Sequence, residues 1–304
     1  MNVLSCFDGM SCGQIALNRI GVKYDNYFAS EIDKYAITVT QHNYPNTKQI
    51  GDIKGVKSDD LPSIDLLIGG SPCQNLSFAG KQNGLTTKCN LDITSLEQYL
   101  ELKKDGFEFE GQSYLFWEFV RLLKEVKPKY FLLENVKMSK KWLSIFNKII
   151  GVNGVLINSS LVSAQNRERY YWTNIPNITQ PVDKGVLLKE ILENNPSDKF
   201  NLSDKAVNYM SRLRDGKPRF KHRKNNLNGK SFCLLAVQYK GVPYGVIEDK
   251  RYADKYRRLT PLECERLQTV NDGYTSIVSN TQRYKMLGNG WTVDVVAHIL
   301  KNII

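Results

Sequence analysis

Short apolar runs alternate with amphipathic stretches along the first half of the chain. Runs with the length and composition of buried strands cover residues 3–7, 27–30, 64–69, 130–134 and 155–161. Between them, residues 13–20, 33–44, 114–126 and 140–150 carry apolar side chains at helical spacing. Strands that alternate with crossover helices predict an α/β fold, in which a parallel sheet has helices on both faces and a ligand crevice at the carboxyl ends of its strands.

Near residue 175 this pattern gives way to segments rich in Pro and Asn, such as Asn195-Pro196-Ser197. The helical pattern returns at 259, where Thr260-Pro261-Leu262-Glu263 has the form of a helix start, and residues 293–303 form a final apolar helix. We therefore predict a first domain at 1–174, a smaller second domain at 175–258, and a segment at 259–304 that completes the first domain. Residues 86–112 resemble a polar insertion with one helix at 96–103.

Positive charge is concentrated in one part of the chain. The formal net charge is +11, from 42 Lys and Arg against 31 Asp and Glu. Residues 205–258 contain fifteen of the basic residues and four of the acidic ones, which leaves twenty-seven of each elsewhere. A solvated surface would spread its charge, so this segment favours contact with nucleic acid. The candidates for phosphate contact are Arg212, Arg214, Arg219, Lys221, Arg223 and Lys224, and any of the arginines can read a guanine edge.

Composition excludes several other classes of protein. The hydrophobic content is 41%, and apolar runs such as residues 65–69 are too short to span a bilayer. The first residues lack the basic flank and long apolar stretch of a signal peptide, so we expect a cytoplasmic protein. Six cysteines without a Cys-x-x-Cys pair, beside three histidines, predict neither a metal site nor a disulfide framework. Reduced thiols, one of which can be catalytic, are the expectation.

Glycine and acidic residues follow the first three predicted strands. Gly9 and Gly13 lie between a strand and a helix, which lets a ligand approach the backbone at a helix N-terminus. Glu31 follows the second strand, where a carboxylate is well placed to bind ribose hydroxyls, and Asp52 lies one unit further on, where it can accept from an amine. Each acid, taken alone, is explained equally well as a charge at a helix start.

A sharper signal is the cysteine in Ser71-Pro72-Cys73-Gln74. The preceding strand delivers Cys73 into a turn at the edge of the sheet, and residues 75–84 read as a polar, glycine-containing loop that closes over a substrate. A second apolar strand ends in Glu134, and Arg167 and Arg169 alternate along one side of an extended segment.

These residue types meet the needs of cytosine methylation. Carbon 5 of cytosine is a poor nucleophile, and a thiolate that adds to carbon 6 creates an enamine whose carbon 5 can attack a methyl sulfonium. A buried carboxylic acid at N3 and the exocyclic amine relieves the charge that develops on the ring. A guanidinium on O2 completes the cradle.

The ordered series of motifs resembles the DNA cytosine-5 methyltransferase family. The matching elements are Phe7-x-Gly9, Glu31, Asp52, Ser71-Pro72-Cys73-Gln74, Glu134-Asn135-Val136, Gln165-x-Arg167-x-Arg169, Leu259-Thr260-Pro261 with Arg266-Leu267-Gln268, and Gly288-Asn289. They cover both ends of the chain and leave residues 175–256 unmatched. Pro-Cys-Gln alone is modestly specific, whereas eight elements in this order are highly specific.

The resemblance implies an enzyme that uses S-adenosyl-L-methionine to methylate a cytosine flipped out of double-stranded DNA. It implies that Cys73 is the nucleophile, that Glu134 engages N3, and that Arg169, with Arg167 beside it, provides the O2 contact and a loop anchor. The implied cofactor pocket consists of Phe7, Gly9, Glu31, Ile32, Asp52, Ile53, Pro72, Leu115 and Asn289. Gln74 and Ser77 lie in the implied closing loop and would contact DNA, and the basic segment takes the place of the target-recognition domain.

The resemblance also implies a monomer that acts in a bacterium or in the bacterial host of a phage. A restriction endonuclease that cuts the same target site would be its partner. The sequence departs from the common family pattern at Phe7-Asp8-Gly9, at Gly290-Trp291 and in the insertion at 86–112, to which the sequence assigns no role.

Two alternatives stay open. One branch with the same Pro-Cys motif methylates transfer RNA, and aromatic side chains in the basic segment suit RNA recognition, namely Tyr239, Tyr244, Tyr252 and Tyr256. A catalytically inactive DNA-binding homologue is disfavoured, because every catalytic position is filled. The sequence does not define the target site.

Overall fold

The computed structural model describes residues 1–77, 84–214, 216–218, 223–248 and 255–303. The predicted contacts of Arg219 and Lys221 lie outside these residues, as does most of the predicted closing loop. The chain divides into two compact units. The first comprises Met1–Ile157, Glu168–Thr179 and Ile299–Ile304, and the second comprises Asn158–Arg167 and Gln180–His298.

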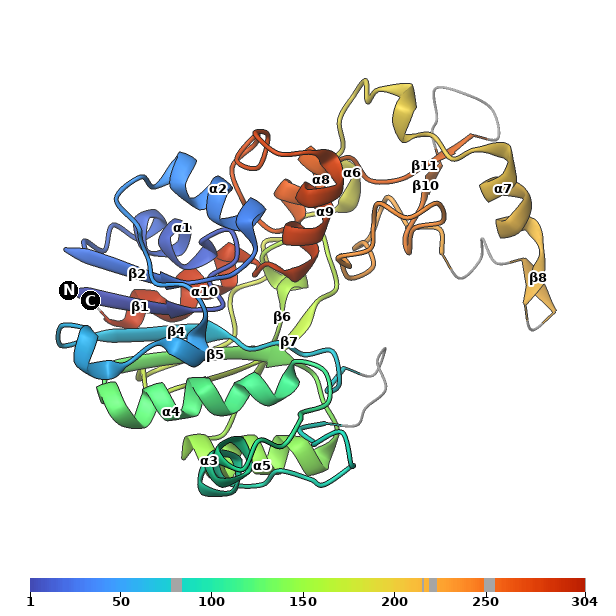
Figure 1. Cartoon of the computed structure of the whole chain (residues 1–304). Helices are drawn as coiled ribbons and strands as arrows, with labels where there is room; N and C mark the ends of the chain where they lie inside the picture. The colour runs from blue at the N-terminus through green and yellow to red at the C-terminus, as the bar shows by residue number, and fades with distance from the viewer. Residues whose placement is uncertain (78–83, 215, 219–222, 249–254, 304) are drawn as a thin grey trace. The chain divides into compact units, whose positions relative to one another are not determined.

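A seven-stranded sheet forms the centre of the first unit, with strand order β3-β2-β1-β4-β5-β7-β6 (Figure 1). The strands are β1 (Asn2–Cys6), β2 (Asn26–Ser30), β3 (Lys48–Gln49), β4 (Leu66–Gly70), β5 (Tyr130–Val136), β6 (Val155–Asn158) and β7 (Glu168–Thr173). The five predicted strands are therefore confirmed, although the last is shorter than expected because Ser159–Leu161 forms a 3-10 turn.

The prediction of an entirely parallel sheet is wrong for one strand. Strands β1 to β5 pair in parallel, but β7 pairs antiparallel to β5. Parallel neighbours need a long crossover connection, whereas antiparallel ones do not. Residues 159–167, which separate β6 from β7, hold only the 3-10 turn and no crossover helix.

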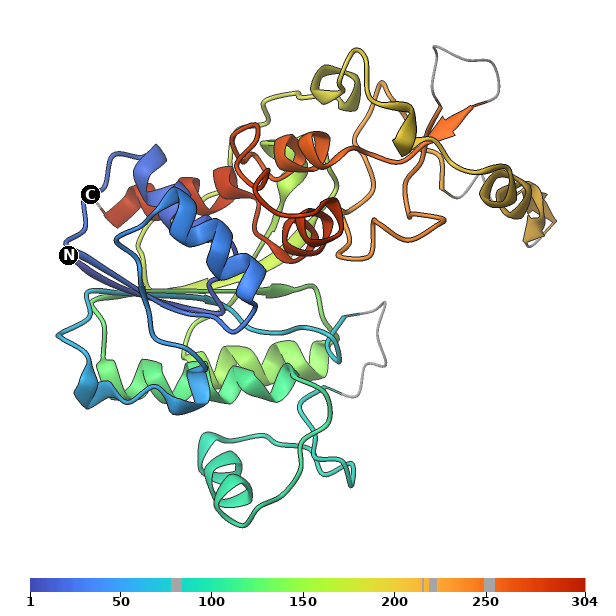
Figure 2. The same ribbon diagram turned by 45° about the horizontal axis from the view of Figure 1, so that its top comes forward.

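Helices cover both faces of the sheet, as the sequence predicts. Figures 1 and 2 show α1 (Cys12–Arg19) and α2 (Lys34–Asn43) on one face, and α4 (Phe116–Val126) and α5 (Lys140–Ile150) on the other. The inserted helix α3 (Leu96–Lys104) packs against α4. Helix α4 forms here because its apolar positions recur at helical spacing and bury Phe116, Phe119 and Leu122, while Lys124 stays in solvent.

The second unit has short elements. Its helices are α6 (Leu188–Ile191), α7 (Asp204–Ser211), α8 (Pro261–Leu267), α9 (Asn280–Asn289) and most of α10 (Val293–Leu300), and its strands are β8 (Leu213–Arg214), β9 (Lys217–Pro218), β10 (Ile247–Glu248) and β11 (Tyr256–Arg257). The predicted helix start is confirmed: the Thr260 hydroxyl accepts from the Glu263 amide, and the Glu263 carboxylate accepts from the Thr260 amide. The final helix ends at Leu300, earlier than predicted, and a 3-10 turn follows.

The compact units do not follow the predicted domain boundaries. Residues 259–298 group with the basic segment rather than with the sheet, since buried Arg257 makes two hydrogen bonds of 2.8 Å to Glu263 at the start of α8. Gln165 in turn donates to the carbonyl of Leu267 at 2.7 Å. The separate functions assigned to 1–174, 175–258 and 259–304 stay predictions. No helix among the described ranges has the length and apolar content to cross a membrane.

Candidate active site

The strand order of the first unit has a switch point at β1. From β1 the chain runs outward through β2 to β3, and it then returns to β4 on the other side of β1. Ligands of α/β proteins bind at such a switch point, beyond the carboxyl ends of the strands. The loops that follow β1 and β4 therefore define the candidate site.

The loop after β4 carries Cys73. Gly70, the last residue of β4, pairs in register with Glu134 of β5, so the turn that contains Cys73 begins beside this carboxylate. The Cys73 carbonyl accepts hydrogen bonds of 3.0 Å from the amides of Leu76 and Ser77, which closes the turn. Cys73 is partly buried, whereas Cys6 and Cys264 are fully buried and burial raises the pKa of both thiols. Its position suits a nucleophile better than theirs.

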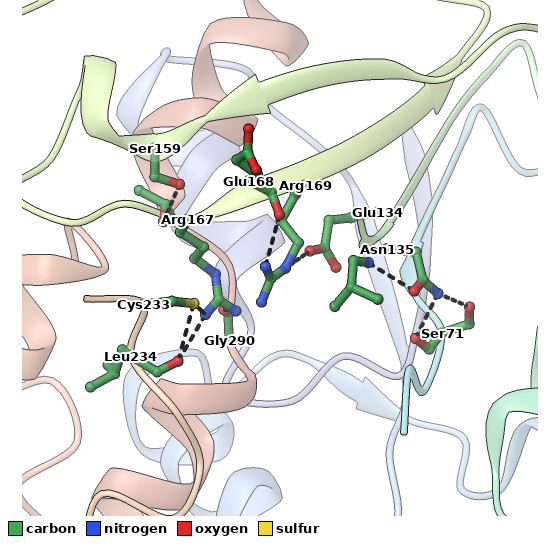
Figure 3. A network of polar contacts seen from close by, with 12 residues as sticks. Ser71, Glu134, Asn135, Ser159, Arg167, Glu168, Arg169, Cys233, Leu234 and Gly290 are labelled. Carbon is green, nitrogen blue, oxygen red and sulfur yellow. Dashed lines mark hydrogen bonds and ion pairs between the residues drawn. The ribbon is translucent and has the colours of Figure 1, made fainter. Parts of the chain in front are cut away.

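Asn135 ties this turn to the neighbouring strand. Its side-chain amide donates to the Ser71 carbonyl at 3.1 Å and to the Ser71 hydroxyl at 2.9 Å (Figure 3). The same side chain accepts from the Val136 amide at 2.8 Å. Sequence reasoning assigned Asn135 no role, although an amide at the end of an apolar strand is the signal that could have found it. It fixes the start of the turn two residues before Cys73.

Glu134 and Arg169 form an ion pair within the first unit. Arg169 Nε lies 2.9 Å from Glu134 Oε1, and the two side chains are 14% and 10% exposed. Their backbones are close because Val136 pairs in register with Arg169. Arg169 Nη1 also donates to the Glu168 carbonyl at 2.9 Å (Figure 3). The structure thus brings together two of the predicted catalytic side chains beside the Cys73 turn.

Arg167 has different partners, all in the second unit. It is 3% exposed, and its guanidinium donates to the carbonyls of Leu234 at 3.1 Å, Gly290 at 2.8 Å and Gly288 at 3.3 Å. Its Nη1 also lies 3.5 Å from the Cys233 sulfur (Figure 3). A guanidinium with donors directed at buried carbonyls anchors the backbone. Asn289 ends helix α9 in the same unit.

The loop after β1 has an unusual backbone. Phe7, Gly9 and Ser11 all have positive φ, at 57°, 59° and 64°. The Gly9 amide donates to Glu31 Oε2 at 2.8 Å. Nothing lies within 4 Å of where a Gly9 side chain would begin, so the backbone is open to a ligand at this point.

Glu31 lies directly after β2, as predicted. Its Oε1 accepts from the amides of Ile32 at 2.7 Å and Asp33 at 2.8 Å. These bonds fix the carboxylate beside the Phe7–Ser11 loop, and a carboxylate oxygen can accept more than one hydrogen bond. Ile32 itself is 67% exposed.

Asp8 is a buried acid that sequence reasoning missed. It is 8% exposed, and the Tyr27 hydroxyl donates to its Oδ1 at 2.8 Å. Burial raises the pKa of Asp8 from its ordinary value of 3.8 to about 6, while neighbouring hydroxyls oppose the rise. Burial also raises the pKa of Tyr27, so its hydroxyl keeps the proton that it donates. The pair fixes the loop between Phe7 and Gly9 to β2.

Asp52 begins the 3-10 turn at Ile53–Gly55. Its carboxylate accepts from the Lys54 amide at 3.0 Å and pairs with the Lys54 ammonium at 3.1 Å. Ile53 is buried beneath it. Of the other predicted pocket residues, Leu115 is buried in the 3-10 turn Ser113–Leu115, and Pro72 is partly buried. Among the described residues no cluster of potential ligands could hold a metal ion.

The predicted DNA contacts lie in both units. Gln74 is exposed and Ser77 partly buried in the first unit, and Arg212 is exposed in the second. Arg214 lies in strand β8. Arg223 Nη1 donates to the Val242 carbonyl at 3.3 Å, and Lys224 forms an ion pair with Glu248. Lys224 is therefore already partly neutralised within the chain.

Comparison with known proteins identifies the family of this chain and some of its relatives. The family model of C-5 cytosine-specific DNA methylases matches residues 1–304. The type II methyltransferase M1.ScrFI of Lactococcus lactis subsp. cremoris is 32% identical over 317 residues, covering 93% of this chain and 72% of that protein. The orphan methyltransferase M.SPBetaI of Bacillus phage SPbeta is 27% identical over 435 residues, with coverage of 100% and 97%.

Solved structures match the fold. DNMT2 of Spodoptera frugiperda aligns with a TM-score of 0.70 and 20% identity over 99% of both chains. The methyltransferase EhMeth of Entamoeba histolytica aligns with a TM-score of 0.72 and 16% identity over 100% of this chain and 97% of that one. At these identities the likeness concerns the fold alone. The whole-chain family match, together with the methyltransferase relatives, shows that this chain is an enzyme of the C-5 cytosine-specific DNA methylase family.

Proposed function

We propose that this enzyme transfers a methyl group from S-adenosyl-L-methionine to carbon 5 of a flipped-out cytosine in a specific duplex DNA site, through a covalent adduct on Cys73. The observation that carries the proposal is the register of β4 and β5, which begins the Cys73 turn beside the Glu134–Arg169 ion pair. Relatives named as DNA methyltransferases and the basic stretch at 205–258 support DNA as the substrate.

The residues around the β1 loop fit the proposed cofactor. The open backbone at Gly9 admits a ligand, and Glu31 presents a fixed carboxylate to ribose hydroxyls. Asp52 presents a second carboxylate to an amine, and Phe7 packs on the apolar core of the first unit. Ile32, Ile53, Pro72 and Leu115 of the first unit would complete the pocket, and Asn289 of the second unit stays a predicted cofactor contact.

Each catalytic side chain has a defined task in the proposed reaction. The Cys73 thiolate forms a bond to carbon 6, and the electrons of the 5,6 double bond move to carbon 5 as Glu134 supports N3. Arg169 orients Glu134 and donates to O2. When bound, the cofactor supplies the methyl sulfonium that carbon 5 attacks. Loss of the carbon 5 proton to a base then expels the Cys73 thiolate and restores the double bond.

Arg167 serves as an anchor in this proposal. Its donors are directed at carbonyls of the second unit. Gln74 and Ser77 would contact the DNA as the loop closes over the flipped base, and Arg212, Arg214, Arg219, Lys221, Arg223 and Lys224 would contact the duplex. We further propose that one monomer acts on each site, which light scattering of the free enzyme and of its DNA complex measures. A restriction endonuclease with the same target site would be its partner.

The test is transfer of labelled methyl groups to mixed-sequence duplex DNA and, separately, to transfer RNA. Bisulfite sequencing then identifies the modified base and its target site. We expect 5-methylcytosine in DNA, lost in Cys73→Ala and retained in Cys89→Ala, because Cys89 is an exposed cysteine. Label in RNA alone would move the substrate to the RNA branch. Label in neither, with DNA that covers every short site, would support an inactive binding module.

A further inference from the structure

The inserted segment at 86–112 is a packed substructure. Its two ends pair through the isolated bridge Thr87↔Phe109, and the Glu110 amide donates to the Thr86 carbonyl at 2.9 Å. A second bridge, Thr86↔Asp92, closes the turn at the start of the segment. Its apolar side chains join the core of the first unit, where Tyr99 is fully buried and Phe109 stacks on Tyr114 with ring centroids 4.5 Å apart. Such a segment can hold the loops that it contacts in a fixed place, because it cannot move without disturbing the core.

One end of the insertion holds the turn that follows Cys73. Buried Asn75 donates from its side chain to the Glu110 carbonyl at 3.0 Å, and its backbone amide donates to the Ser113 hydroxyl at 3.1 Å. Gly111 has a φ of 63°, and a side chain there would begin 2.7 Å from the Asn75 amide nitrogen. The absence of a side chain at Gly111 therefore lets the Asn75 side chain approach the insertion. Asn75 lies two residues after the proposed nucleophile.

Helix α3, in the middle of the insertion, reaches helix α4 through a buried carboxylate. Glu118 is fully buried, and its Oε1 accepts from the Tyr99 hydroxyl at 2.6 Å and from the Lys103 ammonium at 2.5 Å. Both donors lie on the inserted helix α3. Glu118 Oε2 accepts from Arg121 Nε at 2.8 Å. A buried carboxylate with three donors holds one geometry, because loss of a donor leaves a buried acceptor unsatisfied.

Arg121 connects Glu118 to the turn that carries Asp52, a predicted cofactor residue. Its Nη2 donates to the carbonyls of Ile53 at 3.1 Å and Val56 at 3.0 Å. These carbonyls belong to the turn that begins at Asp52. The chain of contacts thus runs from Tyr99 through Glu118 and Arg121 to the turn of Asp52 and Ile53.

We propose that residues 86–112 are a positioning element for methyl transfer, which holds the Cys73 turn through Asn75 and the Asp52 turn through Glu118 and Arg121. The inference rests on the proposed function, because it assigns those two turns to the nucleophile and the cofactor. It gives the insertion a role in catalysis and makes Asn75 and Tyr99 positioning residues that touch no substrate.

The contacts at Asn75 and at Glu118 predict different kinetic effects. Tyr99→Phe removes one donor to Glu118 and keeps the ring, so we expect the KM for the cofactor to rise about fivefold with an unchanged single-turnover rate constant. Asn75→Ala should lower the single-turnover rate constant about tenfold and leave the cofactor KM unchanged. A fall in the folded fraction changes neither the cofactor KM nor the single-turnover rate constant, since it lowers only the concentration of active enzyme. Glu97→Gln is the matched control, because it removes an exposed ion pair between α3 and Lys124 and leaves Glu118 untouched.

Hydrogen exchange tests the same contacts without turnover. Backbone amides at 53–56 should exchange faster in Tyr99→Phe, and those at 73–77 faster in Asn75→Ala, with Glu97→Gln equal to the native chain. If the native chain transfers no methyl group, the proposed function fails, and exchange alone decides whether the insertion holds the two turns. Exchange and kinetics of both variants equal to those of Glu97→Gln, in a chain active toward DNA, would overturn the inference and leave the proposed function intact.

Discussion

Replacement of Arg167 by Met separates an anchoring role from a catalytic one. The side chain keeps an unbranched apolar stem but is shorter and loses every donor. The Gly290 carbonyl still accepts from Gln268 at 3.0 Å, so the carbonyls of Leu234 and Gly288 lose most. A buried polar group without its donor costs about 1–3 kcal/mol, so these two carbonyls give a loss of about 2–6 kcal/mol in the free energy of unfolding of the second unit.

The assay is urea unfolding followed by brief proteolysis, with cleavage sites mapped to each unit. At an m-value of about 2 kcal/mol per molar urea, the midpoint for the second unit should fall by about 1–3 M. Arg212→Met is the control, because Arg212 is an exposed arginine of the same unit and its loss should cost under about 0.5 kcal/mol.

Two results would refute this reasoning. Equal midpoints for the Arg167 and Arg212 variants would mean that the three carbonyls do not depend on the guanidinium. Native stability combined with complete loss of methyl transfer would place Arg167 on the substrate instead.

Three further predictions concern other parts of the chain. Asp8→Asn should gain stability relative to the native chain as pH rises from 4 to 7, by about 3 kcal/mol, because the raised pKa of Asp8 stabilises the fold only while the acid is protonated; denaturation at several pH values measures this, and a constant difference would contradict it. Asn135→Leu should slow methyl transfer at least about tenfold in single turnover, because it frees Ser71. Calorimetry should find native cofactor binding, and an unchanged rate would argue against this anchor. Neutralising Lys221, Arg223 and Lys224 together should lower the slope of log affinity for DNA against log salt by about 2 rather than 3, because Lys224 is paired with Glu248; an unchanged slope would exclude these phosphate contacts.

The sequence predicts well those elements whose buried positions form a regular pattern within one segment. Strands β1, β4 and β5 are continuous apolar runs because helices cover both faces, and α5 has the bounds predicted from its spacing. Strand β7 escaped assignment because the charged residues Glu168 and Arg169 interrupt its apolar pattern, and its direction depends on the short connection from β6. The grouping of residues 259–298 depends on pairs such as Arg257 with Glu263, which no periodicity reports.

The candidate site shows the same division. Glu31 and Cys73 could be located from sequence because they directly follow strands at the sheet edge. The partners of Arg167 and Arg169 could not, since alternate positions on an extended segment look equivalent until the contacts are known. Asp8 was missed because the sequence of a loop does not distinguish a buried acid from an exposed one. Only the contact with Tyr27 on β2 shows that Asp8 is buried.

The central claim is that Cys73 forms a covalent bond to the cytosine it helps to methylate. A duplex that carries the target site with fluorine in place of hydrogen at carbon 5 of the target cytosine blocks the final elimination, so the adduct persists. Mass spectrometry of the native enzyme with this duplex and the cofactor should find one oligonucleotide joined to the peptide that contains Cys73. Cys73→Ala should give no adduct, and Cys89→Ala should give the native yield. An adduct on another residue, or methylation of ordinary DNA by Cys73→Ala, would contradict the account.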